Sequence, residues 1–208
     1  MSTFKKSLLL IFLLLVIDQA IKIYIKLNFN LGESIPIFGF DWARIHFTEN
    51  KGAAFGILFG GNTGKLILSL FRIIAIIGLT YFLYRIEKLK LSKIATFSIV
   101  LILTGAIGNM IDSAFYGIIF SSSVHSIAQI FPESGGYAPL LFGSVVDMFH
   151  FPMYEITAPN WFPEWERFPW NPGDQISFFP YIFNFADACI TIGVIIVLFF
   201  RNHFSKVL

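Results

Sequence analysis

The chain has few charged residues and a single cysteine, and each scarcity narrows its class. Charged residues make up 13% of its 208 positions, about half the share of a typical soluble domain. Apolar residues make up 56%, and the mean hydropathy is +0.72. The single cysteine, Cys189, excludes an intrachain disulfide and a cysteine-built metal site. The composition therefore predicts a membrane protein of one domain, residues 1–208.

Several catalytic signatures are also missing. The four histidines are scattered and no His-Glu-x-x-His stretch occurs, which argues against a zinc protease. No Gly-x-Ser-x-Gly stretch occurs either, which argues against a serine hydrolase of that type. A serine–lysine dyad at Ser69 or Ser113 stays open, although no lysine is well placed for either. We expect no metal, no cofactor and no nucleic-acid partner.

Four apolar runs are long enough to cross a bilayer, whose ~30 Å hydrocarbon core takes about 20 helical residues. The predicted spans are residues 8–25, 66–84, 94–116 and 182–200. Two lysines precede the first run, as in a signal peptide. No small-x-small cleavage site follows it, so we expect a retained first span.

A basic segment between the second and third runs predicts the orientation. Residues 85–93 are rich in Lys and Arg, and such short loops lie in the cytoplasm. An even number of spans then places both termini in the cytoplasm and residues 28–65 and 117–180 on the outer face. The predicted fold class is an all-α membrane protein with four transmembrane helices and two outer-face loops.

The outer loops carry their own structural signals. Residues 44–48 alternate as in a short strand, so a small β element is expected there. Trp161, Trp165 and Trp170, with prolines nearby, predict a segment at the headgroup boundary. A loop as long as residues 117–180 is more often functional than idle.

Polar residues within the spans gather at the outer level of the bilayer. The first and third spans run from the cytoplasm outward, and the fourth runs back inward. Residues late in the first and third spans therefore lie at the same depth as residues early in the fourth. The six residues concerned are Asp18, Lys22, Asn109, Asp112, Asn184 and Asp187. Each pair is three or four residues apart and so shares a helix face. Intramembrane ionisable residues are functional candidates by default.

Most of these residues also have a structural interpretation. Asp18 and Lys22 stand in the favourable order for a helix ion pair and can act as a staple. Asn109 can join two helices, and Asp112 can cap or pair near the interface. Asp187 is the hardest to explain structurally, because no basic residue lies within two turns of it on its own helix.

A second carboxylate, Asp147, lies in an apolar stretch of the outer loop that brings it back towards the bundle. Two carboxylates close together share a proton, because like charges do not easily ionise side by side. One can then activate water while the other protonates a carbonyl, as in aspartic proteases.

Two other hypotheses compete with a protease. A proton-coupled carrier would use Asp18, Asp112 and Asp187 as a relay, but no acid lies near the cytoplasmic side of the spans and no repeat is visible. A catalytically inactive scaffold would tolerate Asp147→Asn and Asp187→Asn.

Five blocks of sequence resemble the lipoprotein signal peptidases, or signal peptidase II, a family of four-span aspartyl peptidases. They are residues 18–22 (DQAIK), 49–56 (ENKGAAFG), 105–112 (GAIGNMID), 145–148 (VVDM) and 183–188 (FNFADA), in the family's order. The resemblance implies that Asp147 and Asp187 form the catalytic dyad. It implies substrate-binding or supporting roles for Asn50, Gly52, Gly105, Asn109, Asp112, Asn184, Asp18 and Lys22.

The resemblance also implies a substrate and a location. The substrate would be a prolipoprotein that carries diacylglycerol on its lipobox cysteine, and the cut would precede that cysteine. The enzyme would lie among the lipids of the bacterial cytoplasmic (inner) membrane, with its active site near the outer, periplasmic face. We expect a monomer.

The chain departs from the family at two places. An arginine usually follows the third-span aspartate, where this chain has Ser113. Arg44, Arg72 or Arg167 replaces that arginine from elsewhere, or the enzyme works without one. Residues 118–142 and 152–179 have no counterpart in the compact form of the family and are interpreted as insertions.

Overall fold

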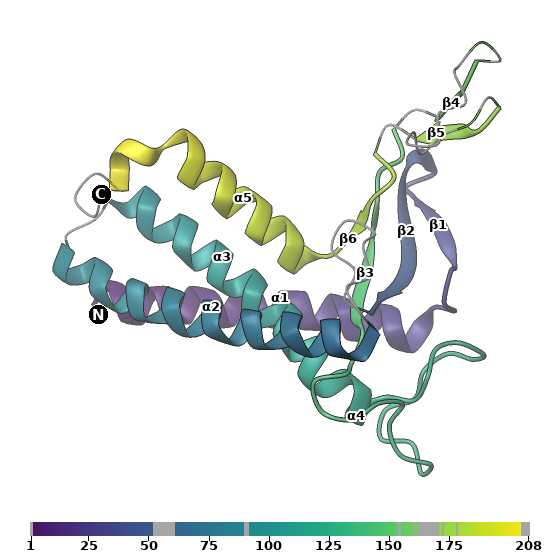
Figure 1. Cartoon of the computed structure of the whole chain (residues 1–208), viewed down its shortest axis with the longest axis horizontal. Coiled ribbons are helices and arrows are strands. Elements are labelled where there is room, and N and C mark those ends of the chain that lie inside the picture. Colours follow the sequence, from purple (N-terminus) through teal and green to yellow (C-terminus); the bar gives the residue numbers. More distant parts are fainter. Residues whose placement is uncertain are drawn as a thin grey trace.

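Four helices lie side by side in the computed structural model, with both chain termini at the same end of the bundle (Figure 1). They are α1 (Thr3–Asn28), α2 (Gly61–Leu89), α3 (Lys93–Ile111) and α5 (Phe185–Phe199). The structure describes residues 2–51, 61–89, 92–153, 155–159, 161, 171, 173–177 and 179–204. Helix α3 is the most buried of the long helices and contacts the other three.

Three helical stretches are long and apolar enough to cross a membrane, namely Thr3–Asn28, Thr63–Ile86 and Lys93–Ile119. They contain the first three predicted spans. The third stretch includes a π-helical turn, Asp112–Tyr116, and the short helix α4 (Gly117–Ile119). The chain is therefore a mostly helical, multi-pass membrane protein.

The fourth apolar run begins its helix later than predicted. Ile182 and Phe183 form strand β6, and Asn184 has an extended backbone and caps α5. The Asn184 side chain accepts a hydrogen bond from the Asp187 backbone N–H, and the Asp187 side chain accepts one from the Asn184 N–H. This capping box satisfies two free N–H groups and starts the helix at Phe185. With 15 residues, α5 is shorter than the other three long helices.

Helices α3 and α5 approach each other backbone to backbone. A Cβ atom added at Gly105 would lie 2.2 Å from the Ala186 carbonyl oxygen, and one added at Gly193 would lie 2.8 Å from the Ser98 carbonyl oxygen. Glycine allows such contacts because it has no side chain in the way, as is common between membrane helices. The first turn of α5 is thereby held against the middle of α3.

A small antiparallel sheet stands across the outer end of the helices (Figure 1). Its order is β1-β2-β3-β6, formed by Ser34–Ile37, Phe40–Asn50, Val145–His150 and Ile182–Phe183. The predicted strand in residues 44–48 is confirmed as part of β2. The second outer loop was not expected to pair with it, yet Asp147 lies opposite Thr48. The fold thus has more β structure than the all-α prediction allowed.

The two predicted insertions differ in structure. Residues 118–142 fold back along the end of α3, where the Ala138 N–H donates to the Gly117 carbonyl and the Gly143 N–H donates to the Ser113 carbonyl. The second insertion contains a separate two-stranded sheet of β4 (Glu155–Thr157) and β5 (Gln175–Ser177). Trp161 is exposed, whereas Trp165 and Trp170 of the predicted headgroup segment lie outside the described residues.

An apolar cluster beneath the sheet orients strand β3. Successive side chains of a strand point to opposite faces. Val146 and Met148 are fully buried in the cluster, together with Phe47 of β2 and Tyr116 at the end of α3. The carboxylate of Asp147 therefore emerges on the other face of the strand, towards the first turn of α5.

Candidate active site

Asn184 joins the two predicted catalytic carboxylates. Its side-chain Nδ2 donates to Asp147 Oδ1 over 2.6 Å. Through the capping box its backbone N–H donates to Asp187 Oδ2 over 3.3 Å. Asp147 comes from strand β3 and Asp187 from α5, 40 positions later in the chain, so the sheet and the bundle meet at this asparagine.

Asn109 supports the same pair from helix α3. Its Nδ2 donates to Asp187 Oδ1 over 2.7 Å. Its Oδ1 accepts from Asn184 Nδ2 and from Lys22 Nζ, each over 3.1 Å. The side chain is almost fully buried and uses both ends of its amide. A single amide thus connects Asp187, Asn184 and the lysine of helix α1.

Lys22 lies at the centre of a fully buried ion cluster. Its Nζ is 3.1 Å from Asp18 Oδ2 and 2.9 Å from Asp112 Oδ2. The predicted Asp18–Lys22 pair is therefore present, and Asp112 pairs rather than caps. Removing one partner from a buried ion pair is strongly destabilising, because it leaves an uncompensated charge.

The ion cluster also holds the backbone around both candidate catalytic acids. Asp18 Oδ1 accepts from the Ala186 N–H over 3.0 Å, next to Asp187. Asp112 Oδ2 accepts from the Val146 N–H over 3.3 Å, next to Asp147. Asp18 thus fixes the backbone just before Asp187, and Asp112 fixes the backbone just before Asp147.

Burial and a neighbouring charge raise the pKa of Asp147 to about 7. Burial has the larger effect because the ionised carboxylate loses its hydration, and the negative charge of Asp187 adds to it. The hydrogen bond from Asn184 acts in the opposite direction. Asp147 therefore holds its proton up to near-neutral pH.

The structure describes two of the three remaining predicted residues, Gly105 and Asn50. Gly108, which was not predicted as a site residue, lies against Asp18, since a Cβ added there would be 2.6 Å from Asp18 Oδ2. Gly105 lies on the α3–α5 contact. Asn50 ends strand β2 opposite Val145, two residues from Asp147. Gly52 lies outside the described residues.

Of the three arginines considered as replacements at the Ser113 position, Arg72 reaches it. Its Nη1 donates to Ser113 Oγ over 2.9 Å. Arg44 instead bonds Ser34 on the sheet, and Arg167 lies outside the described residues.

Sequence reasoning missed Gln19, whose Nε2 donates to Asp112 Oδ1 over 2.9 Å. Its position next to Asp18 in the first block was the available signal.

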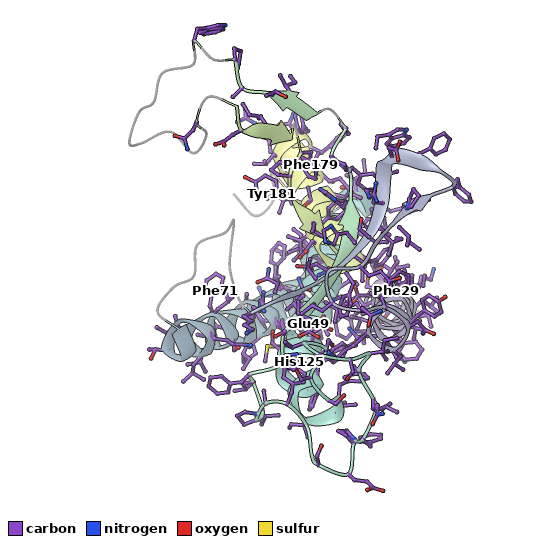
Figure 2. All side chains as sticks on the ribbon, turned by 90° about the vertical axis from the view of Figure 1, so that its right-hand side faces the viewer. Phe29, Glu49, Phe71, His125, Phe179 and Tyr181 are labelled. Atoms are coloured by element: carbon purple, nitrogen blue, oxygen red, sulfur yellow. The ribbon has the colours of Figure 1, made fainter. Side chains whose placement is uncertain are left out.

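A second buried ion pair, which the sequence did not reveal, lies where the sheet meets the helices. Lys26 of α1 pairs with Glu49 of β2 and donates to Ser123 Oγ over 2.9 Å. Its ammonium also lies over the rings of Phe120 and Tyr137. Figure 2 shows Glu49 near the centre of the view along the helices. This pair ties the first insertion to α1 and β2.

The described residues contain no group of three His, Cys, Asp or Glu side chains placed to hold a metal ion. Together, the helical bundle and the buried acids define a multi-pass membrane enzyme. The sequence profile of the family described as signal peptidase (SPase) II matches residues 10–202. The chain belongs to the signal peptidase II family, as its sequence blocks predicted.

Individual relatives agree with this membership. The lipoprotein signal peptidase of Porphyromonas gingivalis is 48% identical over 190 residues, which cover 91% of this chain and 79% of the relative. That of Amoebophilus asiaticus is 34% identical, over 89% of this chain and 73% of its own. A solved bacterial membrane enzyme with 22% identity has the same fold, with a TM-score of 0.60 over 99% of this chain and 93% of its own. The family supports a protease that removes signal peptides from prolipoproteins.

Proposed function

We propose that this protein is an intramembrane aspartic endopeptidase that cuts diacylglyceryl-modified prolipoproteins directly before the lipidated cysteine. The observation that carries the proposal is the bridge made by Asn184, which donates to both Asp147 and Asp187. A residue whose side-chain amide contacts one carboxylate and whose backbone N–H contacts the other holds the two acids at one place. No metal and no covalent intermediate are needed for this chemistry.

The hydrogen bonds suggest a different task for each acid. Asp187 accepts hydrogen bonds from the Asn109 side chain and the Asn184 backbone, which hold its carboxylate in place for the role of base. Asp147 keeps its proton because its pKa is raised to about 7. Asp187 would take a proton from water as the water oxygen attacks the scissile carbonyl, and Asp147 would protonate the carbonyl oxygen. The C–N bond then breaks: the leaving nitrogen receives the proton that Asp187 holds, and Asp147 takes back a proton from one of the two hydroxyl groups on the former carbonyl carbon.

The arrangement of the helices supports the predicted topology. The basic segment between α2 and α3 lies at the same end of the bundle as both termini, opposite the sheet (Figure 1). We therefore propose four membrane spans with cytoplasmic termini, in the bacterial cytoplasmic membrane. The sheet and the dyad would lie at the outer face, where a lipid-anchored precursor arrives. Because every described residue of the site comes from this one domain, we propose that the protein acts as a monomer.

The test is cleavage of a diacylglyceryl-modified prolipoprotein by the purified protein in detergent. Asp147→Asn and Asp187→Asn are nearly isosteric and remove only the acid, so each should lower the rate by several orders of magnitude. Asp41→Asn is the matched control, because Asp41 is an exposed acid on β2 and should leave cleavage unchanged. Thermal unfolding of each variant shows whether it is folded.

Two results would contradict the proposal. Near-wild-type cleavage by either dyad variant would make that aspartate structural, and Asp112 would become the next candidate. Failure of the wild type to cut the lipidated precursor would favour the carrier hypothesis, which proton-flux measurements in vesicles would then examine.

A further inference from the structure

Arg72 places a guanidinium group within a predicted membrane span. It lies in the middle of α2 and is half-buried, between neighbours such as Phe71 and Ile74 that face outward. Phe71 lies on the outer side of α2 (Figure 2). A charge at this depth is costly unless it faces the bundle or a wet cavity. The guanidinium of Arg72 turns inward, to Ser113 of the π-helical turn.

Ser113 is well suited to hold this arginine. Its hydroxyl donates to the Asn109 carbonyl over 3.0 Å, so its oxygen is free to accept from Arg72 Nη1 over 2.9 Å. The serine is buried and directly follows Asp112. It also lies one turn after Asn109, whose side chain holds Asp187. The guanidinium is thus attached to the helical turn that supports the dyad.

The described acids of the site form no ion pair with Arg72. Among the described residues no carboxylate lies within ion-pair distance of Arg72, and Ser113 is its one hydrogen-bond partner. A guanidinium has five N–H donors. Most of these donors are therefore not used by the described part of the chain.

A purely structural role for Arg72 has less support. Two other polar residues on the same face of α2 already join that helix to the first insertion. Lys65 Nζ donates to the Phe142 carbonyl over 2.7 Å, and Ser69 Oγ lies 3.5 Å from the Leu141 carbonyl. Arg72 lies one turn beyond Ser69 and bonds Ser113, which directly follows Asp112 of the ion cluster.

We propose that Arg72 is a substrate-binding residue of this peptidase, held by Ser113 so that the N–H groups left unused by the described residues bind main-chain carbonyls of the precursor beside the scissile bond. The inference rests on the proposed function. It assigns the substrate-binding arginine to helix α2, whereas the resemblance implies one on the third span. Arginine suits this task because its planar fork can bind two acceptors at once.

The experiment compares kcat and KM for a diacylglyceryl-modified prolipoprotein across a set of variants. Arg72→Gln should lower kcat/KM by roughly ten- to a hundredfold, because substrate carbonyls lose a hydrogen bond from a charged donor, with an unchanged unfolding temperature. Arg72→Lys should recover only part of the loss. Arg85→Gln is the matched control, since Arg85 is an exposed arginine on the same helix that bonds Tyr81.

Moving the arginine from residue 72 to residue 113 distinguishes a substrate-binding role of Arg72 from a purely structural one. Adding Ser113→Arg to Arg72→Gln returns a guanidinium to this region from the π-helical turn, and activity should rise at least tenfold. The proposal is overturned if Arg72→Gln keeps near-wild-type activity. It is also overturned if activity falls only as far as the folded fraction falls and the added arginine restores nothing. A wild type and Arg85→Gln that both fail to cut would instead overturn the proposed function.

Discussion

Replacing Asp147 with Asn should stabilise the folded protein at high pH while it abolishes cleavage. The pKa of this carboxyl is about 4 in an unfolded chain and about 7 in the fold. Below pH 4 the group is neutral in both states and contributes no difference. Above pH 7 it is ionised in both states, and the fold bears the cost of a buried charge. That cost is about 4 kcal/mol, and it develops between pH 4 and pH 7.

The variant escapes this cost and keeps the local contact. An asparagine at this position has no charge to bury, and its side-chain oxygen can still accept from Asn184 Nδ2. At pH 8 the variant should therefore unfold roughly 10 °C above the wild type, since 1 kcal/mol corresponds to about 2–4 °C in a chain of this size. At pH 4 the two should unfold at nearly the same temperature.

Thermal unfolding in detergent at pH 4, 6 and 8 measures this difference. Asp41→Asn is the control, because the Asp41 side chain is 98% exposed and its removal should change little at any pH. Equal unfolding temperatures for Asp147→Asn and the wild type at pH 8 would refute the claim that the fold raises this pKa. A stabilisation that is the same at every pH would refute it too, since that result requires a packing effect.

The same titration limits the rate of the wild type. Protonated Asp147 is the proposed proton donor, so kcat/KM should fall as pH rises through about 7. A rate profile for the lipidated precursor measures this limb. A flat profile between pH 6 and pH 8 would mean that Asp147 does not act as the acid.

Two further predictions concern the packing around the site. Gly105→Ala places a methyl group 2.2 Å from the Ala186 carbonyl oxygen and should cost about 1–3 kcal/mol in unfolding free energy. Gly78→Ala is the control, because Gly78 lies on α2 with open space around it, and it should be neutral or stabilising by up to about 1 kcal/mol. A denaturant titration measures both variants, and equal effects of Gly105→Ala and Gly78→Ala would count against the close α3–α5 contact. Lys26→Met leaves the buried Glu49 unpaired and should cost about 3–5 kcal/mol, of which adding Glu49→Leu should return most. A Lys26→Met protein as stable as the wild type would show that this pair is not buried in solution.

The sequence alone was enough to predict the helices and to single out the costly polar residues within them. A run of about 20 apolar residues has few other stable structures, and an acid within such a run is noticeable because it is costly. Asp18, Asn109 and Asp187 were therefore recognisable before any partner was known. Local spacing also predicted the Asp18–Lys22 ion pair, since residues four apart on a helix are neighbours whatever the rest of the chain does.

Tertiary structure decided which residues meet. The partners of Asn184 lie 37 and 75 positions away, at Asp147 and Asn109, and no periodicity reports pairing over such distances. The same holds for β3, whose pairing with β2 turns Asp147 towards α5. It also holds for Arg72, whose partner Ser113 is on another helix. Hydropathy and spacing describe each segment by itself, whereas the site is made of contacts between segments.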